Sequence, residues 1–563
     1  MTGPAGPGGS AGPSGPAGPG GKTGLLMVCG TASDVGKSHL VTALCRLFHR
    51  RGVRVAPFKA QNMALNSAVT PAGHEIGRAQ AVQARAAGVD AEVAMNPVLV
   101  KPTGERTSQV VVMGRPWGHH DAVSFQAAKA GLRVIVADAL ADLRSRFDVV
   151  ILEGAGSPAE INLLDDDIVN LRLAAEVGAP ALVVGDIDRG GVFAALYGTV
   201  ALLPDDLRPL VRGFVINKFR GDPALLGDGL ADLERRSGVP TLGVLPWIHD
   251  VGLDAEDSLA LRGRRPSAAT HSLGDTLDVA VVRFPRIANF TDLEALETEP
   301  GVGVRMVEQP GVLGDPDLVV LPGTKTTVAD LEWLRHTGLD LALNGARARG
   351  SVVLGICGGY QMLGQTIVDE VEAPASGHGR AADLGRVPGL GWLDVTTEFA
   401  PTKVTRQRRG WALGQHVAGY EIHHGRVSQG PAARPWAHLD GDEGRSDEGA
   451  SDATGQVRGT TLHGLFDDDG FRRAFLVDVS RRRDRDFVPV HRSFAAAREA
   501  QIDRLADMVE ANLDLAAVDE LTGHYVQATQ AEQRVRATQA EPPVRATQAE
   551  QTVRATQARE PSR

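Results

Sequence analysis

Short apolar runs alternate with longer amphipathic segments along most of the chain. The runs are apolar throughout instead of alternating with polar residues, which indicates strands buried on both faces, as in a parallel sheet covered by helices. The runs expected as strands lie at 25–29, 53–58, 149–152, 181–184, 213–216, 241–245, 279–284, 302–307, 318–321 and 352–356. The pattern therefore predicts an α/β protein with two parallel-sheet domains.

The pattern changes in the second half, where the apolar runs become shorter and more widely spaced. Shorter strands are expected at 389–395 and 418–427. The polar stretches at 370–384 and 428–456 are expected to be surface loops.

The end of the ordered chain is predicted to be a helix over 494–515. In a helix, Ile502, Leu505 and Val509 share one face, which would pack against a core. We expect this helix to close the second domain.

The domain organisation follows from length and local composition. At 563 residues the chain is too long for one ordinary domain. Its start is rich in Gly and Pro, and its end repeats the unit V-x-A-T-Q-A with a nine-residue period from Val526; such stretches lack the apolar residues of a core and are expected to be disordered. The predicted division is a tail at 1–23, a first domain at 24–262, a linker at 263–276, a second domain with its terminal helix at 277–515 and a repeat tail at 516–563.

Charge and cysteine content narrow the range of partners. The formal net charge of −10 argues against a nucleic-acid partner. The sequence has no apolar run long enough to span a membrane, so no membrane partner is expected. Three cysteines do not make a disulfide framework and fit a cytoplasmic protein. The sequence leaves the oligomeric state open, a homo-oligomer included.

A glycine-rich turn, 30-GTASDVGKS-38, joins the first predicted strand to a helical segment. Such a turn directs backbone N–H groups and a helix N-terminus at an anion, so it predicts a nucleotide phosphate site. Lys37 would reach the outer phosphates of ATP and Ser38 would bind Mg²⁺. Thr31 stands where the common loop has its first glycine, a variant that resembles the dethiobiotin synthetase type of loop. The nucleotide-binding residues expected here are Gly30, Thr31, Asp34, Gly36, Lys37 and Ser38. The plainer alternative is a glycine turn that only caps a helix.

Polar side chains follow the other predicted strands of the first domain, at the sheet edge where open α/β proteins bind ligands. Glu153 would hold the metal directly or through water, unless it only caps a helix or turn. Asn217 would contact the nucleotide base, although a turn-forming Asn is nearly as plausible. The residues expected to face the substrate are Asp186 and Arg189 in GDIDRGGVFA and Lys59, Gln61 and Asn62 in PFKAQNMALNS.

Cys357 lies in 350-GSVVLGICGGYQMLG-364, between a predicted strand and a short helix at 360–364. A strand–nucleophile–helix turn exposes the thiol, and the helix N-terminus favours its reactive thiolate form. The backbone N–H of Gly358, with that of Gly323 in LPGTK, would stabilise an oxyanion. His463 in TTLHGLF is the expected base. The alternative is a buried, inert thiol, which is the expectation for Cys29 and Cys45.

These motifs together carry a family resemblance over about residues 24–475. GICGGYQMLG, LPGTK and His463 resemble class I glutamine amidotransferase domains of the cobyrinate branch. GTASDVGKS, PFKAQNMALNS, LEGAGSPAEINL, GDIDRGGVFA, NKFRGD and GYEIHHG resemble the cobyric acid synthase family.

The resemblance implies a P-loop ATP-dependent amide synthase domain followed by a glutamine amidotransferase domain. It further implies amidation of the b, d, e and g carboxylates of adenosylcobyrinic acid a,c-diamide to give adenosylcobyric acid. ATP, Mg²⁺ and L-glutamine are then required, and cobalt is present only within the corrinoid substrate.

The sequence departs from the wider amidotransferase pattern at one position. Many class I glutaminases place a glutamate two residues after the histidine, and here that position is Leu465. The cobyrinate branch lacks this glutamate, so the group that supports His463 stays open; Glu421 and His423 are the candidates.

Two alternative functions remain from the sequence. One is a cobyrinic acid a,c-diamide synthase, with the same domains and different carboxylates. The other is a P-loop switch ATPase of the partitioning type with an inactive glutaminase-like domain. Such ATPases carry a further lysine near the loop start, which Thr31 and Ala32 do not supply.

Overall fold

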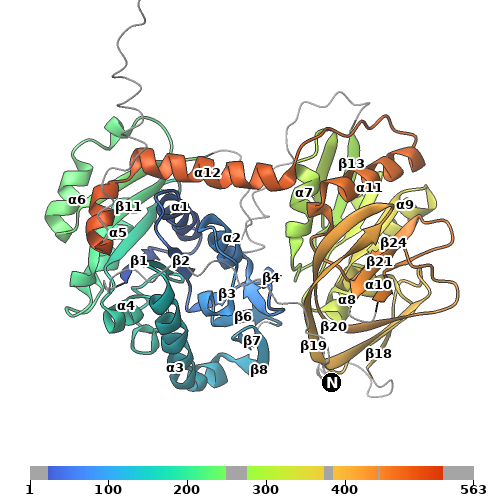
Figure 1. Ribbon diagram of the computed structural model, residues 1–563, viewed down its shortest axis with the longest axis horizontal. Helices are drawn as coiled ribbons and strands as arrows, with labels where there is room; N and C mark the ends of the chain where they lie inside the picture. Colours follow the sequence, from blue (N-terminus) through green and yellow to red (C-terminus); the bar gives the residue numbers. More distant parts are fainter. Residues whose placement is uncertain (1–22, 105, 249–275, 373–384, 442–443, 524–563) are drawn as a thin grey trace, which may run out of the picture.

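The computed structural model describes residues 23–104, 106–248, 276–372, 385–441 and 444–523. Two lobes lie side by side, and one long helix crosses the first lobe and reaches the edge of the second (Figure 1). The predicted linker at 263–276 lies almost entirely outside the described residues, as do the Gly/Pro-rich start and the repeats.

The first domain is built on a parallel six-stranded sheet in the order β12-β11-β10-β1-β9-β2. Met27 in β1 lies opposite Ala181 of β10 and Leu152 of β9, so β1 is central. Its neighbours Leu26 and Val28 pack in a different core from Met27, which shows that helices cover both faces. The strands are β1 (Gly24–Gly30), β2 (Val55–Phe58), β9 (Val149–Glu153), β10 (Ala181–Asp186), β11 (Val211–Phe219) and β12 (Thr241–Pro246).

Helices and two small sheets complete this domain. The sequence pattern did not predict the small sheets, because their strands are short and mostly mix polar with apolar residues. The helices are α1 (Lys37–Arg50), α2 (Arg78–Ala86), α3 (Ala122–Arg146), α4 (Leu171–Val177), α5 (Val192–Ala201) and α6 (Gly229–Ser237). One small sheet contains β3 (Gln61–Met63), β6 (Val98–Pro102), β7 (Thr107–Val112) and β8 (Arg115–Asp121), and the other is the hairpin of β4 (Ser67–Val69) and β5 (Glu75–Gly77).

The second domain contains a six-stranded sheet in the order β14-β13-β15-β16-β24-β23, parallel except for β23. Gly355 in β16 lies opposite Leu321 of β15 and Gly459 of β24. The carboxyl ends of these three strands therefore meet at one edge of the sheet. The strands are β13 (Leu277–Val282), β14 (Val302–Val307), β15 (Leu318–Leu321), β16 (Val352–Ile356), β23 (Ala450–Ser451) and β24 (Val457–Thr460), and the helices are α7 (Glu294–Glu297), α8 (Thr327–His336), α9 (Leu339–Ala348), α10 (Gly358–Leu363) and α11 (Asp469–Arg482).

The expected fold class is confirmed, since every predicted strand of the two parallel sheets is present. The later part of the second domain differs from the prediction. The strand expected at 389–395 is absent except for Val395, which begins a long strand. The strand expected at 418–427 is part of a second long strand that pairs with the first as an antiparallel hairpin, and the predicted loop at 428–456 contains strands as well. The sheet comprises β17 (Thr366–Val368), β18 (Arg386–Pro388), β19 (Val395–Ala412), β20 (Gln415–Gln429), β21 (Ala437–Gly441) and β22 (Gly444–Glu448). Much of it is exposed, so its strands mix polar with apolar residues and lack the continuous apolar runs of the buried sheets.

The terminal helix α12 (Phe494–Asn512) has the predicted apolar face but packs on the other domain. Ile502, Leu505 and Val509 join the core that contains α1 and one face of the first sheet. The predicted apolar face therefore packs on the first domain, whereas Phe494 at the start of the helix joins the core of the second domain. The predicted tail also begins too early, because α13 (Leu515–Thr522) is a helix whose Val518 is buried in the same core.

Among the described residues, no helix combines the length and the apolar character that crossing a membrane requires.

The packing of α12 gives a test of this domain assignment. Ile502 is 1% exposed, so Ile502→Ala is expected to lower the free energy of unfolding by roughly 2–5 kcal/mol through the cavity it leaves. Hydrogen exchange, read by mass spectrometry, should accelerate in α1 and β12 and stay unchanged in β16. Glu510→Ala, on the exposed face of α12, is the matched control, with an expected change within about 0.5 kcal/mol. Faster exchange confined to β16 would show instead that the apolar face of the helix packs on the second domain.

Candidate active site

The glycine-rich turn of the first domain wraps the ammonium group of Lys37. Lys37 Nζ donates to the carbonyl oxygens of Ala32, at 2.9 Å, and Gly156, at 3.3 Å. Gly36 precedes α1 with φ of 101°, and a Cβ there would lie 2.1 Å from Asn217 Nδ2. Only glycine fits this position, and the turn takes the form of a phosphate-binding loop at the N-terminus of a helix.

The carboxylate of Glu153 organises the residues beneath this turn. It accepts hydrogen bonds from Ser38 Oγ at 2.8 Å, Lys59 Nζ at 2.9 Å and Gln83 Nε2 at 2.5 Å. Burial alone would raise the pKa of Glu153, but Lys59 outweighs it, with help from Ser38 and Gln83, and holds that pKa below its usual value.

This arrangement distinguishes the two side chains predicted to bind metal. Ser38 lines the adjoining cavity, and its hydroxyl oxygen suits Mg²⁺ that is shared with phosphate oxygens. Glu153 is buried beneath it with its oxygens already bonded, so its place fits a residue that positions Ser38 rather than a direct ligand. Across the described ranges, no cluster of three or more His, Cys, Asp or Glu side chains could bind a metal.

A cavity of ≈ 1260 Å³ opens above the carboxyl edge of the first sheet. This volume exceeds the common upper range of about 1,000 Å³ for small-molecule pockets. The predicted residues that line it are Asp34, Gly36, Lys37, Ser38, Asn217, Lys59, Gln61, Asn62 and Arg189. The cavity therefore has room for more than a nucleotide.

Four predicted residues do not line this cavity, and each of them has structural contacts instead. Gly30 ends β1 with no room for a side chain against Val35, and the N–H of Thr31 donates to Val184 O. Asp186 forms ion pairs with Lys218 and Arg189. Glu153 is the fourth.

Cys357 occupies a sharp turn between β16 and α10. Its φ of 51° and ψ of −108° are unusual for a residue with a side chain, a conformation that costs about 1–3 kcal/mol and that the surrounding structure must hold. Gly359 permits the turn, since a Cβ there would lie 1.9 Å from Leu321 O. The other two cysteines are buried, and burial raises the pKa of both Cys29 and Cys45, which fits inert core thiols.

His463 follows β24 and faces Cys357 across the sheet edge. Asp292 accepts a hydrogen bond from His463 Nδ1 at 2.7 Å, and its second oxygen accepts one from the N–H of Gly464 at 2.7 Å. Burial alone would lower the pKa of His463, but the Asp292 carboxylate and a hydrogen bond to Cys357 outweigh it and raise the pKa to about 10.

Asp292 is thus the group that supports His463, and neither earlier candidate takes that place. Glu421 forms ion pairs with Arg406 and Arg408, and His423 Nδ1 bonds to Gly425 O at 2.6 Å. Both lie on β20, and His423 lines the pocket of Cys357 while its Nδ1 is bonded to the backbone of its own strand.

A peptide of the first domain reaches the neighbours of His463. The N–H of Ser67 donates to Asn289 Oδ1 at 2.9 Å, and Ser67 O accepts from the hydroxyl of Tyr420 at 3.1 Å. Asn289 Nδ2 lies 3.5 Å from His463 Nε2, and the Tyr420 ring stacks on the imidazole with centroids 5.3 Å apart. No pattern in the sequence indicated these contacts, which join distant segments.

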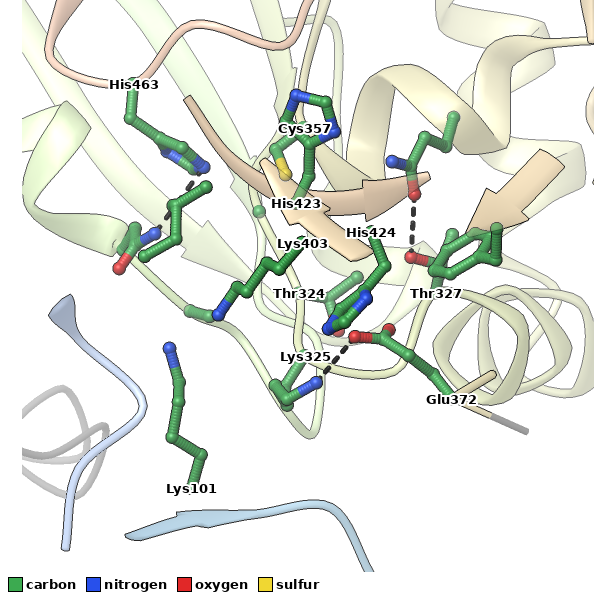
Figure 2. Close-up of a pocket in the computed structure, with 16 residues that line it drawn as sticks. Lys101, Thr324, Lys325, Thr327, Cys357, Glu372, Lys403, His423, His424 and His463 are labelled. Carbon is green, nitrogen blue, oxygen red and sulfur yellow. Dashed lines mark hydrogen bonds and ion pairs between the residues drawn. The ribbon is translucent and has the colours of Figure 1, made fainter. Parts of the chain in front are cut away.

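Asn289 and His463 line a pocket around Cys357 together with side chains from both domains (Figure 2). Of the predicted residues, it gathers Cys357, His463, Gly323 and His423, while Gly358 packs against Thr324 just behind. Lysines that the sequence reasoning missed also line the pocket, namely Lys101, Lys325 and Lys403. The nucleophile, base and supporting carboxylate have the geometry of a cysteine hydrolase site.

Two family models match the chain. A CobQ/CobB/MinD/ParA nucleotide binding domain matches residues 26–260, which hold the glycine-rich turn. A CobB/CobQ-like glutamine amidotransferase domain matches residues 278–471, which hold Cys357 and His463.

Curated relatives match along most of their length. A cobyric acid synthase of Rhodococcus jostii is 54% identical over 89% of this chain and 96% of the relative. Those of Nocardia farcinica and Frankia casuarinae are 52% and 50% identical, over 88% and 89% of this chain and 96% of each relative. With both domains matched and about half of the residues identical, the chain belongs to the cobyric acid synthase family.

Proposed function

We propose that this chain converts adenosylcobyrinic acid a,c-diamide to adenosylcobyric acid by amidating its b, d, e and g carboxylates, with ATP and glutamine as co-substrates. The observation that carries the proposal is the placement of two unlike sites around one short segment. Pro285 and Arg286 line the large cavity, whereas Ala288 and Asn289 line the pocket of Cys357. Ammonia released at Cys357 therefore has only a short distance to travel to a carboxylate activated in the large cavity.

The second domain supplies ammonia in this proposal. His463 accepts the proton of Cys357, whose thiolate attacks the amide carbon of glutamine. The N–H groups of Gly323 and Gly358 stabilise the oxyanion, and the His463 imidazolium then gives its proton to the departing ammonia. Water hydrolyses the thioester and releases glutamate. Asp292 keeps the imidazole oriented throughout.

The first domain activates the acceptor. A carboxylate is a poor electrophile, so its oxygen first takes the γ-phosphoryl group of ATP, giving an acyl phosphate that ammonia can attack. Lys37 and the N–H groups of the turn stabilise the charge on the transferred group. Ser38, positioned by Glu153, would hold Mg²⁺, which neutralises phosphate charge when bound. Lys59, Gln61, Asn62 and Arg189 are the side chains we assign to the acceptor.

Direct passage between the sites suits the chemistry of ammonia. In water at neutral pH most ammonia is protonated and not nucleophilic. Asn289 and its neighbours, placed between the two sites, would shield it on the way.

A mass-spectrometric count of amidations tests the proposal. The full chain would receive ATP, Mg²⁺, glutamine and adenosylcobyrinic acid a,c-diamide, and four successive amidations are expected. Glutamine hydrolysis without amidation would keep the two-site amidotransferase and point to cobyrinic acid as the acceptor. Absence of both would overturn the proposal.

Separating the nitrogen sources tests the division of labour. Cys357→Ala is expected to abolish glutamine-dependent amidation and to retain amidation with ammonium salts, because only the nucleophile is lost. Lys37→Ala, changed in the other site, should stop amidation from either source. Equal loss from both sources in a folded Cys357→Ala protein would contradict separate roles for the domains.

The ion pair of His463 predicts how the reactivity of Cys357 depends on pH. In Asp292→Asn the charge that raises the pKa of His463 is gone, so burial lowers that pKa and the thiolate loses its cationic partner. We expect the turnover number for glutamine hydrolysis to fall about 10²–10⁴-fold, as for other catalytic histidines that lose their carboxylate. Because the raised pKa belongs to His463, the pH dependence of glutamine hydrolysis between about pH 6 and pH 9 should differ between Asp292→Asn and the unchanged protein.

Glu421→Gln is the matched control for Asp292→Asn. Its carboxylate is buried in the same domain but pairs with arginines, so a small effect on turnover is expected. A loss as large as that of Asp292→Asn would restore Glu421 as the supporting group.

A further inference from the structure

Two lysines from different domains meet at the pocket of Cys357. Lys101 lies on β6 of the first domain and Lys403 on β19 of the second, and both line the pocket. Figure 2 shows the side chains of Lys101 and Lys403 extending towards each other beneath His463. Their partner is Glu75 of β5, whose oxygens lie 2.7 Å from Lys101 Nζ and 2.6 Å from Lys403 Nζ.

This group of three carries an unbalanced charge. Two ammonium groups share one carboxylate, so the net charge is one positive, and the side chains of Lys101 and Lys403 are only 4% and 5% exposed. Within the described part of the chain, neither lysine has a second carboxylate within 4.0 Å. A buried charge is costly unless an opposite charge accompanies it, so the pair is suited to an anion.

The remaining charges of the pocket do not supply that anion. Lys325 is matched by Glu372 at 2.6 Å, and burial lowers the pKa of His424 to about 4, which leaves its imidazole neutral. Burial, together with the neighbouring Lys403 and Lys325, lowers the pKa of Lys101 to about 8 although Glu75 raises it. Lys101 therefore gains from any further negative group that enters the pocket.

We propose that Lys101 and Lys403 bind the α-carboxylate of glutamine, so that a residue of the first domain completes the glutaminase site. The assignment rests on the proposed glutaminase reaction. An amino acid as short as glutamine, with its amide carbon at Cys357, keeps its α-carboxylate within the same pocket. The lysine pair is the place there where positive charge exceeds negative charge, and the bound carboxylate would complete its charge balance.

The site then selects an α-amino acid over a simple amide. It also makes glutamine binding depend on the docking of the two domains, because Lys101 is held by Glu75 and by Ser67 Oγ, at 2.6 Å, within the first domain.

Two reagents that modify Cys357 test the assignment in the full chain. 6-Diazo-5-oxo-L-norleucine carries the α-carboxylate of glutamine, and iodoacetamide does not. In Lys101→Met, the second-order rate of modification by the first reagent is expected to fall about 10–100-fold, the usual effect of one charge-assisted hydrogen bond. The rate with iodoacetamide should change by less than about threefold.

The charge-conserving variant Lys101→Arg should recover most of the lost rate. Lys403→Met, changed in the other domain, should reproduce the selective loss. Amidation with ammonium salts shows whether Lys101→Met is folded. If it is not folded, Lys403→Met provides the test in its place. Equal losses with both reagents, or no loss with either, would overturn the carboxylate assignment. Failure of the unchanged protein to react with 6-diazo-5-oxo-L-norleucine would instead contradict the proposed glutaminase reaction.

Discussion

The buried carboxylate of Glu75 holds the two halves of the molecule in register. It bridges Lys101 of its own domain and Lys403 of the other, in a place where water does not compete for either bond. Around it, the β4–β5 hairpin lies against the long β19–β20 hairpin, with Val69 packed on Tyr420 and Ile422. The alignment of the two cavities, and the contacts of Ser67 with the neighbours of His463, depend on this joint.

Strand ends explain why so much of the two sites could be predicted from the sequence. In a parallel sheet the carboxyl ends of neighbouring strands meet at one edge, so residues that follow separate apolar runs converge. This places Gly323, Cys357 and His463 in one pocket after β15, β16 and β24. The same rule brings Lys37, Glu153 and Asn217 together, although the carboxylate of Glu153 is already bonded to Ser38, Lys59 and Gln83.

The rest could not be predicted because it depends on partners far away in the sequence. Asp292 lies 171 positions before His463, in a stretch without a glycine turn or a recognisable motif. The apolar face of α12 was visible in its periodicity, but periodicity does not tell which core will cover that face. Likewise, nothing in the sequence distinguishes Lys101 from other lysines on strands, because its position at the pocket depends on how the two domains pack together.

The position of α12 bears on how the chain folds during synthesis. The first domain buries one face of its sheet partly under Ile502, Leu505 and Val509, which are made after the entire second domain. At usual rates of synthesis, of about 5–20 residues per second, the sheet that ends with β12 at Pro246 waits roughly 12–50 s for the helix that begins at Phe494. During that interval the nascent first domain exposes an apolar face, so it is in this stage, rather than in the finished enzyme, that the chain most needs protection from aggregation.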